Sequence, residues 1–344
     1  MSSNVYLSSD EIEELHVEVS TLCNASCPMC ARNYHGYGLT PNPGFGTWKR
    51  GDEDRVFTDE LKNLKRVIFC GTHGDPLTSP FFLETVDYIR RRFKNVIIEI
   101  NTNGSLRTLK WWNELLDLLQ EKGRIVFGVD GIDTNHLYRQ GTDIDKILER
   151  MEMTSASKTQ VQWDFLVFKH NEHELEYCKK LAKDLNIDKF RVRRTARFKE
   201  DKFPVLNKNK EVTHYLEPPF NEDYKHPSYG KIQSVNKVVP TDYEIKCTYK
   251  EKKRIYVNSR LEVFPCCYIS DENEAMKIDK LRSELDFPIE SFNLRSKSWS
   301  DILNHPFYKN ELVSSFNDKR AYTRCVKTCG VLAREDGQNL VVEL

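Results

Sequence analysis

The chain has 344 residues with 52 basic and 52 acidic side chains, and 39% of its residues are hydrophobic. This balance excludes a chain drawn by net charge onto nucleic acid or an anionic membrane, and no apolar run approaches the ~18 residues of a membrane span. The first twenty residues carry five acidic side chains and no apolar stretch, so we expect no secretory signal. Ten cysteines in such a chain favour reduced thiols or metal ligands in the cytoplasm over a disulfide framework.

Six strand-like segments alternate with helical patterns along the first 200 residues. They cover residues 15–20, 66–70, 95–101, 124–130, 161–168 and 189–194. Between them, Ser79 and Thr108 are typical helix N-caps, and a further helix is expected over residues 171–186. This alternation indicates a parallel α/β domain, and six units are too few for a closed eight-stranded barrel. A partial, open (β/α)6 barrel or a doubly wound sheet is therefore expected.

Polar side chains recur on the strand face that would line a barrel. This inward set is Glu18, Cys70, Glu99, Asp130, Asp164, Arg191 and Arg193. Burying so many charges without partners would be costly. Two interpretations follow: a wet lumen that holds a polar ligand, or a network of internal ion pairs near the strand ends. We favour the polar ligand.

Residues 201–245 interrupt the alternating pattern. They contain five prolines and little periodicity, so we expect a connector that runs over the surface or the mouth of the site. The chain is accordingly divided into a barrel domain at residues 1–200, this proline-rich connector, and a smaller cysteine-bearing domain at residues 246–344.

The first cysteine cluster follows the first strand. Cys23, Cys27 and Cys30 have the spacing C-x3-C-x2-C, on a loop at the carboxyl end of a strand, where barrel folds hold their chemistry. A structural zinc site normally has four protein ligands, whereas an iron–sulfur cluster with three thiolates has one iron open to a substrate or cofactor. The spacing predicts an active metal centre, with a zinc loop or three unrelated thiols as alternatives.

The segment from Cys23 to Cys30 resembles the signature of the radical SAM superfamily, whose members carry this motif after the first strand of a partial (β/α)6 barrel. The resemblance implies a [4Fe–4S] cluster that binds S-adenosyl-L-methionine and cleaves it reductively to a 5′-deoxyadenosyl radical. It places Met29 where many members carry an aromatic residue that touches adenine. It also implies an electron donor such as flavodoxin or ferredoxin.

Further segments resemble family motifs in the same order along the chain. Residues 73–76 (His-Gly-Asp-Pro) match the segment that grips the methionine amino group, with Asp75 in place of the usual glutamate. A Thr-Asn-Gly turn contains Asn103, Asp130 lies where members contact the ribose or the substrate, and Arg139 lies where a family arginine meets the methionine carboxylate. The resemblance thus implies a cofactor-binding set of Met29, His73, Gly74, Asp75, Pro76, Asn103, Asp130 and Arg139.

A second cysteine set lies in the last hundred residues and comprises Cys247, Cys266, Cys267, Cys325 and Cys329. Neighbouring residues of an extended strand point to opposite faces, so only one of Cys266 and Cys267 should reach a shared metal. The arrangement resembles the twitch domain, a shortened SPASM domain with one auxiliary [4Fe–4S] cluster, and Pro265-Cys266 matches its hairpin ending. The ligands implied are Cys247, Cys266, Cys325 and Cys329, in a small C-terminal α+β iron–sulfur domain. A zinc site with four thiolates is the alternative.

Two arginine residues at the end of the sixth strand are candidates for binding the substrate. Arg191 and Arg193 would suit a carboxylate or phosphate on the substrate or on S-adenosylmethionine, a solvated basic rim being the alternative. With Asp130, they are the candidate catalytic residues. Because only 22 residues precede Cys23, we expect a small polar substrate and no leader-peptide-binding domain.

The reaction expected is a two-electron oxidation in which the auxiliary cluster accepts the second electron. Methyl or carbon–carbon bond chemistry, modification of a peptide or protein side chain, and a non-catalytic zinc-binding module are the alternatives.

Overall fold

The structure is a computed structural model that describes residues 5–39, 46–198, 200–227, 229, 243–271, 289–330 and 339–342. One nine-stranded sheet dominates it, in the order β10-β9-β1-β2-β3-β4-β5-β6-β11. The strands are β1 (Glu14–Val17), β2 (Arg66–Phe69), β3 (Ile97–Thr102), β4 (Gly123–Gly128), β5 (Gln160–Leu166), β6 (Lys189–Arg193), β9 (Arg254–Val257), β10 (Val263–Phe264) and β11 (Asn339–Val342). Every neighbouring pair is parallel except those made by the end strands β10 and β11. The expected parallel α/β fold with an open barrel is confirmed.

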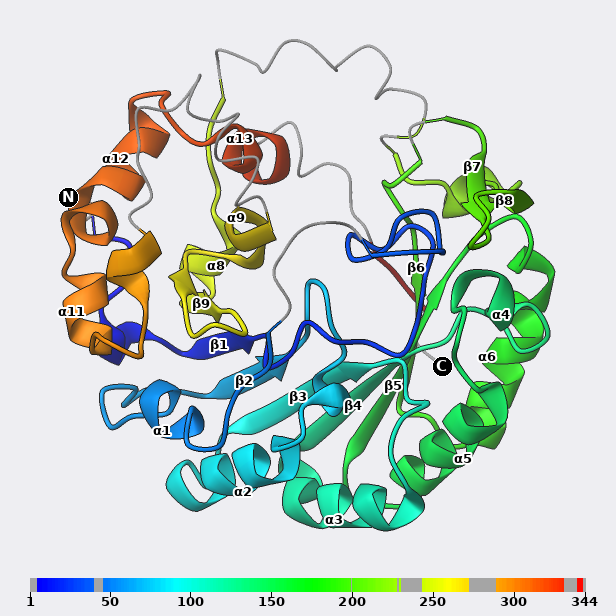
Figure 1. Ribbon diagram of the computed structural model, residues 1–344, viewed down its shortest axis with the longest axis horizontal. Helices are drawn as coiled ribbons and strands as arrows, with labels where there is room; N and C mark the ends of the chain where they lie inside the picture. Colours follow the sequence, from blue (N-terminus) through cyan, green and yellow to red (C-terminus); the bar gives the residue numbers. More distant parts are fainter. Residues whose placement is uncertain are drawn as a thin grey trace.

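Four long helices cover the outside of the curved sheet, as Figure 1 shows. They are α2 (Phe82–Arg92), α3 (Leu109–Leu119), α5 (Ile144–Ser155) and α6 (Leu175–Asp184). Shorter helices are α1 (Glu53–Val56), α4 (Asn135–Tyr138), α8 (Thr248–Glu251), α9 (Cys267–Asp271), α11 (Trp299–Leu303), α12 (Leu312–Asn317) and α13 (Thr323–Cys329).

The predicted helix caps had different outcomes. Thr108 caps α3 as expected, because its hydroxyl accepts a hydrogen bond from the Trp111 amide at 3.3 Å. The prediction for Ser79 is wrong: it ends a short 3-10 turn over Pro76–Thr78, and α2 begins only after Phe81. The helix expected over residues 171–186 is shorter, because its first residues form a separate 3-10 turn.

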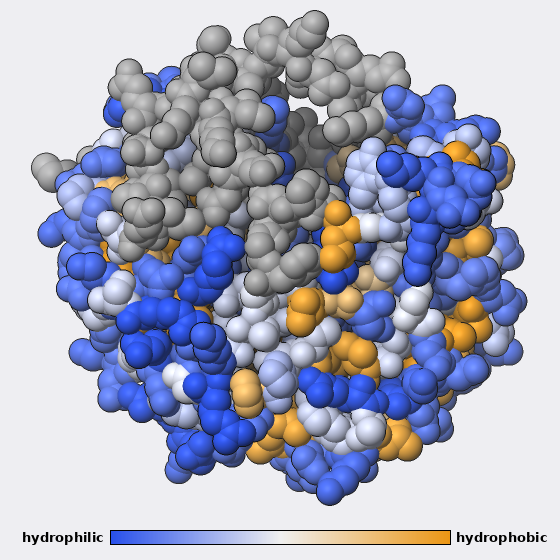
Figure 2. Space-filling view, viewed as in Figure 1, coloured by the Kyte–Doolittle hydropathy of each residue, from blue (hydrophilic) through white to orange (hydrophobic). Residues whose placement is uncertain are grey.

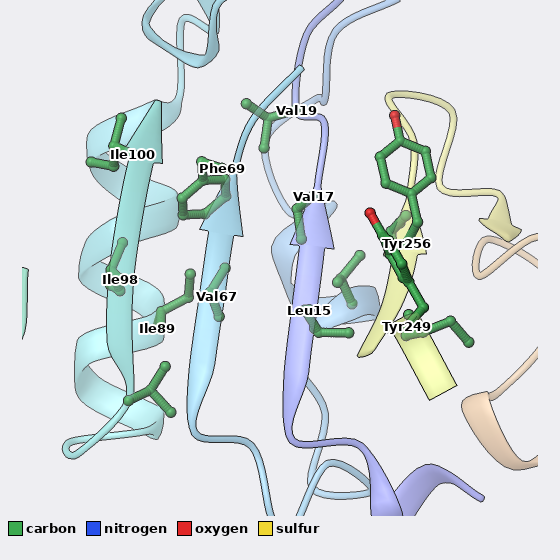
Figure 3. Close-up of a cluster of buried hydrophobic side chains, with 14 of the residues drawn as sticks. Leu15, Val17, Val19, Val67, Phe69, Ile89, Ile98, Ile100, Tyr249 and Tyr256 are labelled. Carbon is green, nitrogen blue, oxygen red and sulfur yellow. The ribbon is translucent and has the colours of Figure 1, made fainter. Parts of the chain in front are cut away.

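The apolar side chains of the strands face the helices and form the main core. Leu15, Val17, Val67 and Phe69 are fully buried there, and Figure 3 shows them between β1, β2 and the neighbouring strands. Burial of each such side chain contributes ~1.5–3 kcal/mol before entropy is counted. The alternate residues must then point into the lumen, which produces the polar inward face expected from the sequence.

The described residues of the C-terminal segment do not form a sheet of their own. Strand β9 lies parallel to β1, with His16 opposite Tyr256, so it extends the barrel wall. Within the expected connector, β7 (Phe203–Leu206) and β8 (Val212–Leu216) pair as an antiparallel hairpin that the sequence analysis did not predict. Pro204 is tolerated because both strands of this two-stranded sheet are edge strands, where a residue without an N–H donor does not interrupt pairing. Residues 230–242 of that connector lie outside the described residues.

Candidate active site

The three-cysteine loop follows β1 at the carboxyl end of the parallel sheet. Its backbone is held by short hydrogen bonds: the Cys30 amide donates to the Cys27 carbonyl at 3.0 Å, and the Asn33 side chain donates to the same carbonyl at 3.2 Å. The Ser26 amide donates to the Gln140 carbonyl at 2.8 Å, which joins the loop to the segment after α4. The three cysteines, which are close together in the sequence, therefore lie on one compact loop.

The three thiols lie in apolar surroundings with Ala25, Met29, Tyr138 and Phe168. Burial raises the pKa of Cys23 to about 12, and the Asp75 carboxylate adds to the rise. Burial also raises the pKa of Cys27 to about 11, although the Arg139 guanidinium opposes it. Thiolates here would need a positively charged partner, and an iron–sulfur cluster held by thiolates supplies one. The donor set fits the [4Fe–4S] group that the spacing implies.

Two glycines allow the turn after β2 to approach this loop. A Cβ on Gly74 would lie 2.0 Å from the Ser20 carbonyl oxygen, and one on Gly71 would lie 2.2 Å from the Gly74 carbonyl oxygen. Both contacts are far shorter than atoms tolerate, so only glycine fits at either position. His73 and Pro76 in the same turn are buried beside them.

Asp75 joins this turn to the turn after β3. Its carboxylate accepts hydrogen bonds from the Leu77 amide at 3.0 Å, the Thr102 hydroxyl at 2.8 Å, and the Asn103 amide at 2.8 Å. The Asn103 side chain also donates to it at 2.9 Å and lies 3.8 Å from the Cys23 sulfur. The side chain of Asp75 is thus saturated by protein donors and 4% exposed. Burial raises its pKa, while these donors oppose the rise.

Asp130 and Arg139 form a buried ion pair. The Arg139 Nε donates to Asp130 Oδ2 at 2.6 Å, and Asp130 Oδ1 accepts from the Leu166 amide at 2.8 Å. Although burial alone would lower the pKa of Arg139, the Asp130 carboxylate raises it overall. Asp130 has no exposed surface, so its carboxylate positions Arg139 beside Cys27 rather than facing the open lumen.

Arg197 is a residue near the cysteines to which the sequence analysis gave no role. Its Nη1 donates to the Tyr138 hydroxyl at 3.0 Å, and it lines one hollow together with Cys30, Met29 and Phe203. Tyr138 is adjacent to Arg139 in the chain, but Arg197 is 59 residues away. Basic residues after the sixth strand were the available signal, yet nothing in the sequence placed this one at the cysteine loop.

Charged side chains of β5 and β6 meet in the lumen. Arg191 makes two hydrogen bonds to the Asp164 carboxylate, one of them from Nε at 2.8 Å, and Arg193 donates to the same carboxylate at 3.0 Å. Burial alone would raise the pKa of Asp164, but the two guanidinium groups outweigh burial and hold this pKa below its ordinary value. The Arg193 side chain is 36% exposed. The internal ion pairs, which were one of the two interpretations, are therefore present, and binding of a polar ligand in the lumen stays a prediction.

The opposite wall of the lumen carries a second polar chain. Glu18 accepts from the His73 amide at 2.7 Å and from the Tyr256 hydroxyl at 2.9 Å, and burial raises the pKa of Glu18. Beside it, His16 lies 2.6 Å from the Tyr249 hydroxyl. Figure 3 shows Tyr256 on β9 and Tyr249, which belongs to α8, close together beside β1. The sequence marked Glu18 as inward, but it could not show that residues 249 and 256 lie beside it.

Four of the C-terminal cysteines line one cavity. They are Cys247, Cys266, Cys325 and Cys329, which is the set expected for the auxiliary cluster. Cys267 does not line this cavity, and its sulfur lies 3.2 Å from the Tyr249 hydroxyl. The sequence analysis expected both Cys266 and Cys267 to lie in an extended strand. This expectation is wrong in part, because Cys267 begins helix α9. The start of the helix turns its side chain away from that of Cys266.

The cavity is otherwise mainly apolar, with Ile269, Leu312 and Phe316 in its wall. Burial raises the pKa of Cys266 well above its ordinary value, and the neighbouring thiols add to this. Four thiols facing one cavity fit a cluster with four thiolate ligands. In the part of the chain that the structure describes, no three His, Cys, Asp or Glu side chains are placed to hold a single metal ion.

No described helix is long and apolar enough to cross a bilayer.

Comparison with known proteins finds similarity over the barrel. The radical SAM superfamily matches residues 17–185. The tungsten-containing aldehyde ferredoxin oxidoreductase cofactor-modifying protein of Pyrococcus furiosus is 23% identical over 270 residues, which cover 69% of this chain and 72% of that protein. The FeMo cofactor biosynthesis protein NifB of Methanocaldococcus jannaschii is 30% identical over 114 residues, 32% of this chain and 37% of that protein.

A solved structure, native anSMEcpe with bound AdoMet, has a TM-score of 0.54 at 15% identity and covers 96% of this chain and 93% of that chain. At this identity, the likeness shows a common fold.

Proposed function

Because the radical SAM superfamily matches residues 17–185, we propose that this chain binds a [4Fe–4S] cluster through Cys23, Cys27 and Cys30 and cleaves S-adenosylmethionine. The observation that carries this proposal is the compact loop at the carboxyl end of the barrel, which holds one buried thiol, Cys27, and two partly buried thiols, Cys23 and Cys30. When bound, such a cluster supplies the electron that breaks the cofactor's sulfur–carbon bond, and the radical produced removes a hydrogen atom from the substrate.

The surrounding residues position the cofactor and exclude water. The glycines of the turn after β2 let its backbone approach the loop, and Asn103 presents an amide close to the Cys23 sulfur. Arg139 brings a guanidinium group to Cys27, held there by Asp130, where it can meet a carboxylate. Asp75 orders both turns through its hydrogen bonds, so we assign it an organising role in cofactor binding.

We infer that the substrate is small, polar and anionic. Arg193 supports this inference because its guanidinium group donates one hydrogen bond to Asp164 while the side chain stays partly exposed. Its other N–H groups can therefore bind an anionic group of the substrate. Arg191 is bound more fully by Asp164, so its role is to position that carboxylate. The name of the Pyrococcus furiosus relative favours a cofactor or cofactor precursor as the substrate class.

An auxiliary [4Fe–4S] cluster in the four-cysteine cavity would accept the second electron of an oxidation. This proposal is supported by the cavity and by Tyr249 in its wall, whose hydroxyl lies 2.6 Å from His16 of β1. A small electron-transfer protein such as a flavodoxin or ferredoxin would reduce the first cluster.

The test is analysis of iron, sulfide and 5′-deoxyadenosine on anaerobically purified protein with dithionite as reductant. We expect roughly eight irons per chain and formation of 5′-deoxyadenosine. Cys23→Ala, Cys27→Ala and Cys30→Ala should each abolish that product. Cys178→Ala is the matched control, because Cys178 is buried in α6 away from both sites. Undiminished product from any of the three loop variants would contradict the assignment.

A further inference from the structure

Two arginines hold Tyr138 from different sides. The Arg139 guanidinium lies 5.4 Å from the centroid of the Tyr138 ring, and the Arg197 Nη1 donates to its hydroxyl at 3.0 Å. The ring itself is buried and packs against Phe168 with centroids 4.7 Å apart. Because the ring cannot move freely, its hydroxyl is a fixed point that positions Arg197.

The charges of these two arginines are balanced differently. Arg139 bonds the fully buried Asp130 carboxylate, so together they carry no net charge. Arg197 bonds an uncharged phenol, and the ion pairs found among the described residues do not include it. Its positive charge therefore lacks a carboxylate partner in that part of the chain.

The uncompensated charge lies beside the three-cysteine loop. Arg197 and Cys30 line the same hollow, and Arg197 follows β6, the strand whose carboxyl end opens toward this loop. A cation in this position acts on any negative charge placed on the three sulfurs.

We propose that Arg197, held by Tyr138, is the positive charge that sets the reduction potential of the iron–sulfur centre at Cys23, Cys27 and Cys30. Reduction adds one electron to the centre and makes it more negative by one charge. A nearby cation stabilises this reduced form and raises the potential, since net charge is one of the properties that set it. The inference rests on the proposed function, because it requires a cluster at these three cysteines.

The experiment is a redox titration of the anaerobically reconstituted full chain with dithionite, followed by electron paramagnetic resonance. The signal that changes when S-adenosylmethionine is added identifies the centre with the open iron. Arg197→Gln should make its reduction about three- to tenfold less favourable, where tenfold corresponds to 59 mV toward more negative potential. Arg197→Lys keeps the charge and should retain most of the potential.

Two further variants separate charge from structure. Tyr138→Phe removes the hydrogen bond that positions Arg197, so we expect a smaller shift in the same direction. Lys202→Gln removes an exposed positive charge five residues further along the chain, which contacts Tyr215, and should leave the potential unchanged. A structural role of Arg197 alone would change iron content without this pattern.

An unchanged potential in Arg197→Gln with full iron content would overturn the proposal. If Arg197→Gln binds less iron than the native chain, Tyr138→Phe decides, and an unchanged potential there overturns it equally. A native chain that shows no signal responding to S-adenosylmethionine would overturn the proposed function, and this inference with it.

Discussion

His16 is a buried histidine whose neutral form the fold requires. Its Nε2 lies 2.7 Å from the Cys70 carbonyl, which only accepts, so Nε2 carries the proton, and its Nδ1 lies 2.6 Å from the Tyr249 hydroxyl. Burial lowers the pKa of His16 from 6.5 to about 4, and the Arg254 charge adds to this. We expect His16 to make the stability of the protein depend on pH in mildly acidic solution.

The direction and size of the effect follow from the two pKa values. The folded state binds the proton less readily than the unfolded state, so the stabilisation is present above pH 6.5 and is lost as the pH falls toward 4. At 1.36 kcal/mol per pH unit, the difference between these values corresponds to about 3 kcal/mol in full. Roughly 1.4 kcal/mol of it should be lost between pH 7.5 and 5.5.

The assay is urea unfolding of iron-free protein at pH 7.5 and 5.5, so that acid loss of iron does not contribute. Between these pH values, the free energy of unfolding of the native chain should fall by about 1.4 kcal/mol more than that of His16→Gln. His136→Gln, an exposed histidine on α4, should behave as the native chain does. Parallel pH dependence of the native chain and His16→Gln would refute the reasoning.

Three further predictions concern the two cysteine sites. Asp75→Ala should lower the free energy of unfolding by about 3 kcal/mol, because buried donors lose their acceptor, and should weaken S-adenosylmethionine binding in calorimetry; unchanged values of both would show that its hydrogen bonds are dispensable. Gly74→Ala should prevent assembly of the first cluster, measured as iron content, since its Cβ would overlap the Ser20 carbonyl. Cys266→Ala should lose about half of the iron and Cys267→Ala should retain it; equal losses would contradict the assignment made from the cavity.

The six parallel strands and the three-cysteine loop were predictable because their signals are local. Cys23, Cys27 and Cys30 lie within eight residues of one another, and a loop of that length cannot separate them widely. The alternation of apolar and polar residues likewise has a period of two within each strand, so it predicts the inward face without knowledge of the neighbouring strands. The family motifs in the turns after the strands follow the same order along the chain.

One prediction failed and another stays open. Ser79 has a suitable side chain for an N-cap, yet the 3-10 turn directly before it determines where α2 begins. Contact of Asp75 with the cofactor stays a prediction. The sequence did not show that Thr102 and Asn103, from the turn after the next strand, donate hydrogen bonds to its carboxylate.

The sequence by itself determined the fold class, the loop of three thiols and the polar lumen, because periodicity and short spacing act within a few residues. Only the tertiary structure decided that β9 extends the barrel beside β1, that Cys266 and not Cys267 faces the second cavity, and that Arg197 reaches Tyr138. The contacts of β9 and of Arg197 join residues 59 or more positions apart. Chain closure over such distances is selected by packing of the whole core, and no local pattern encodes it.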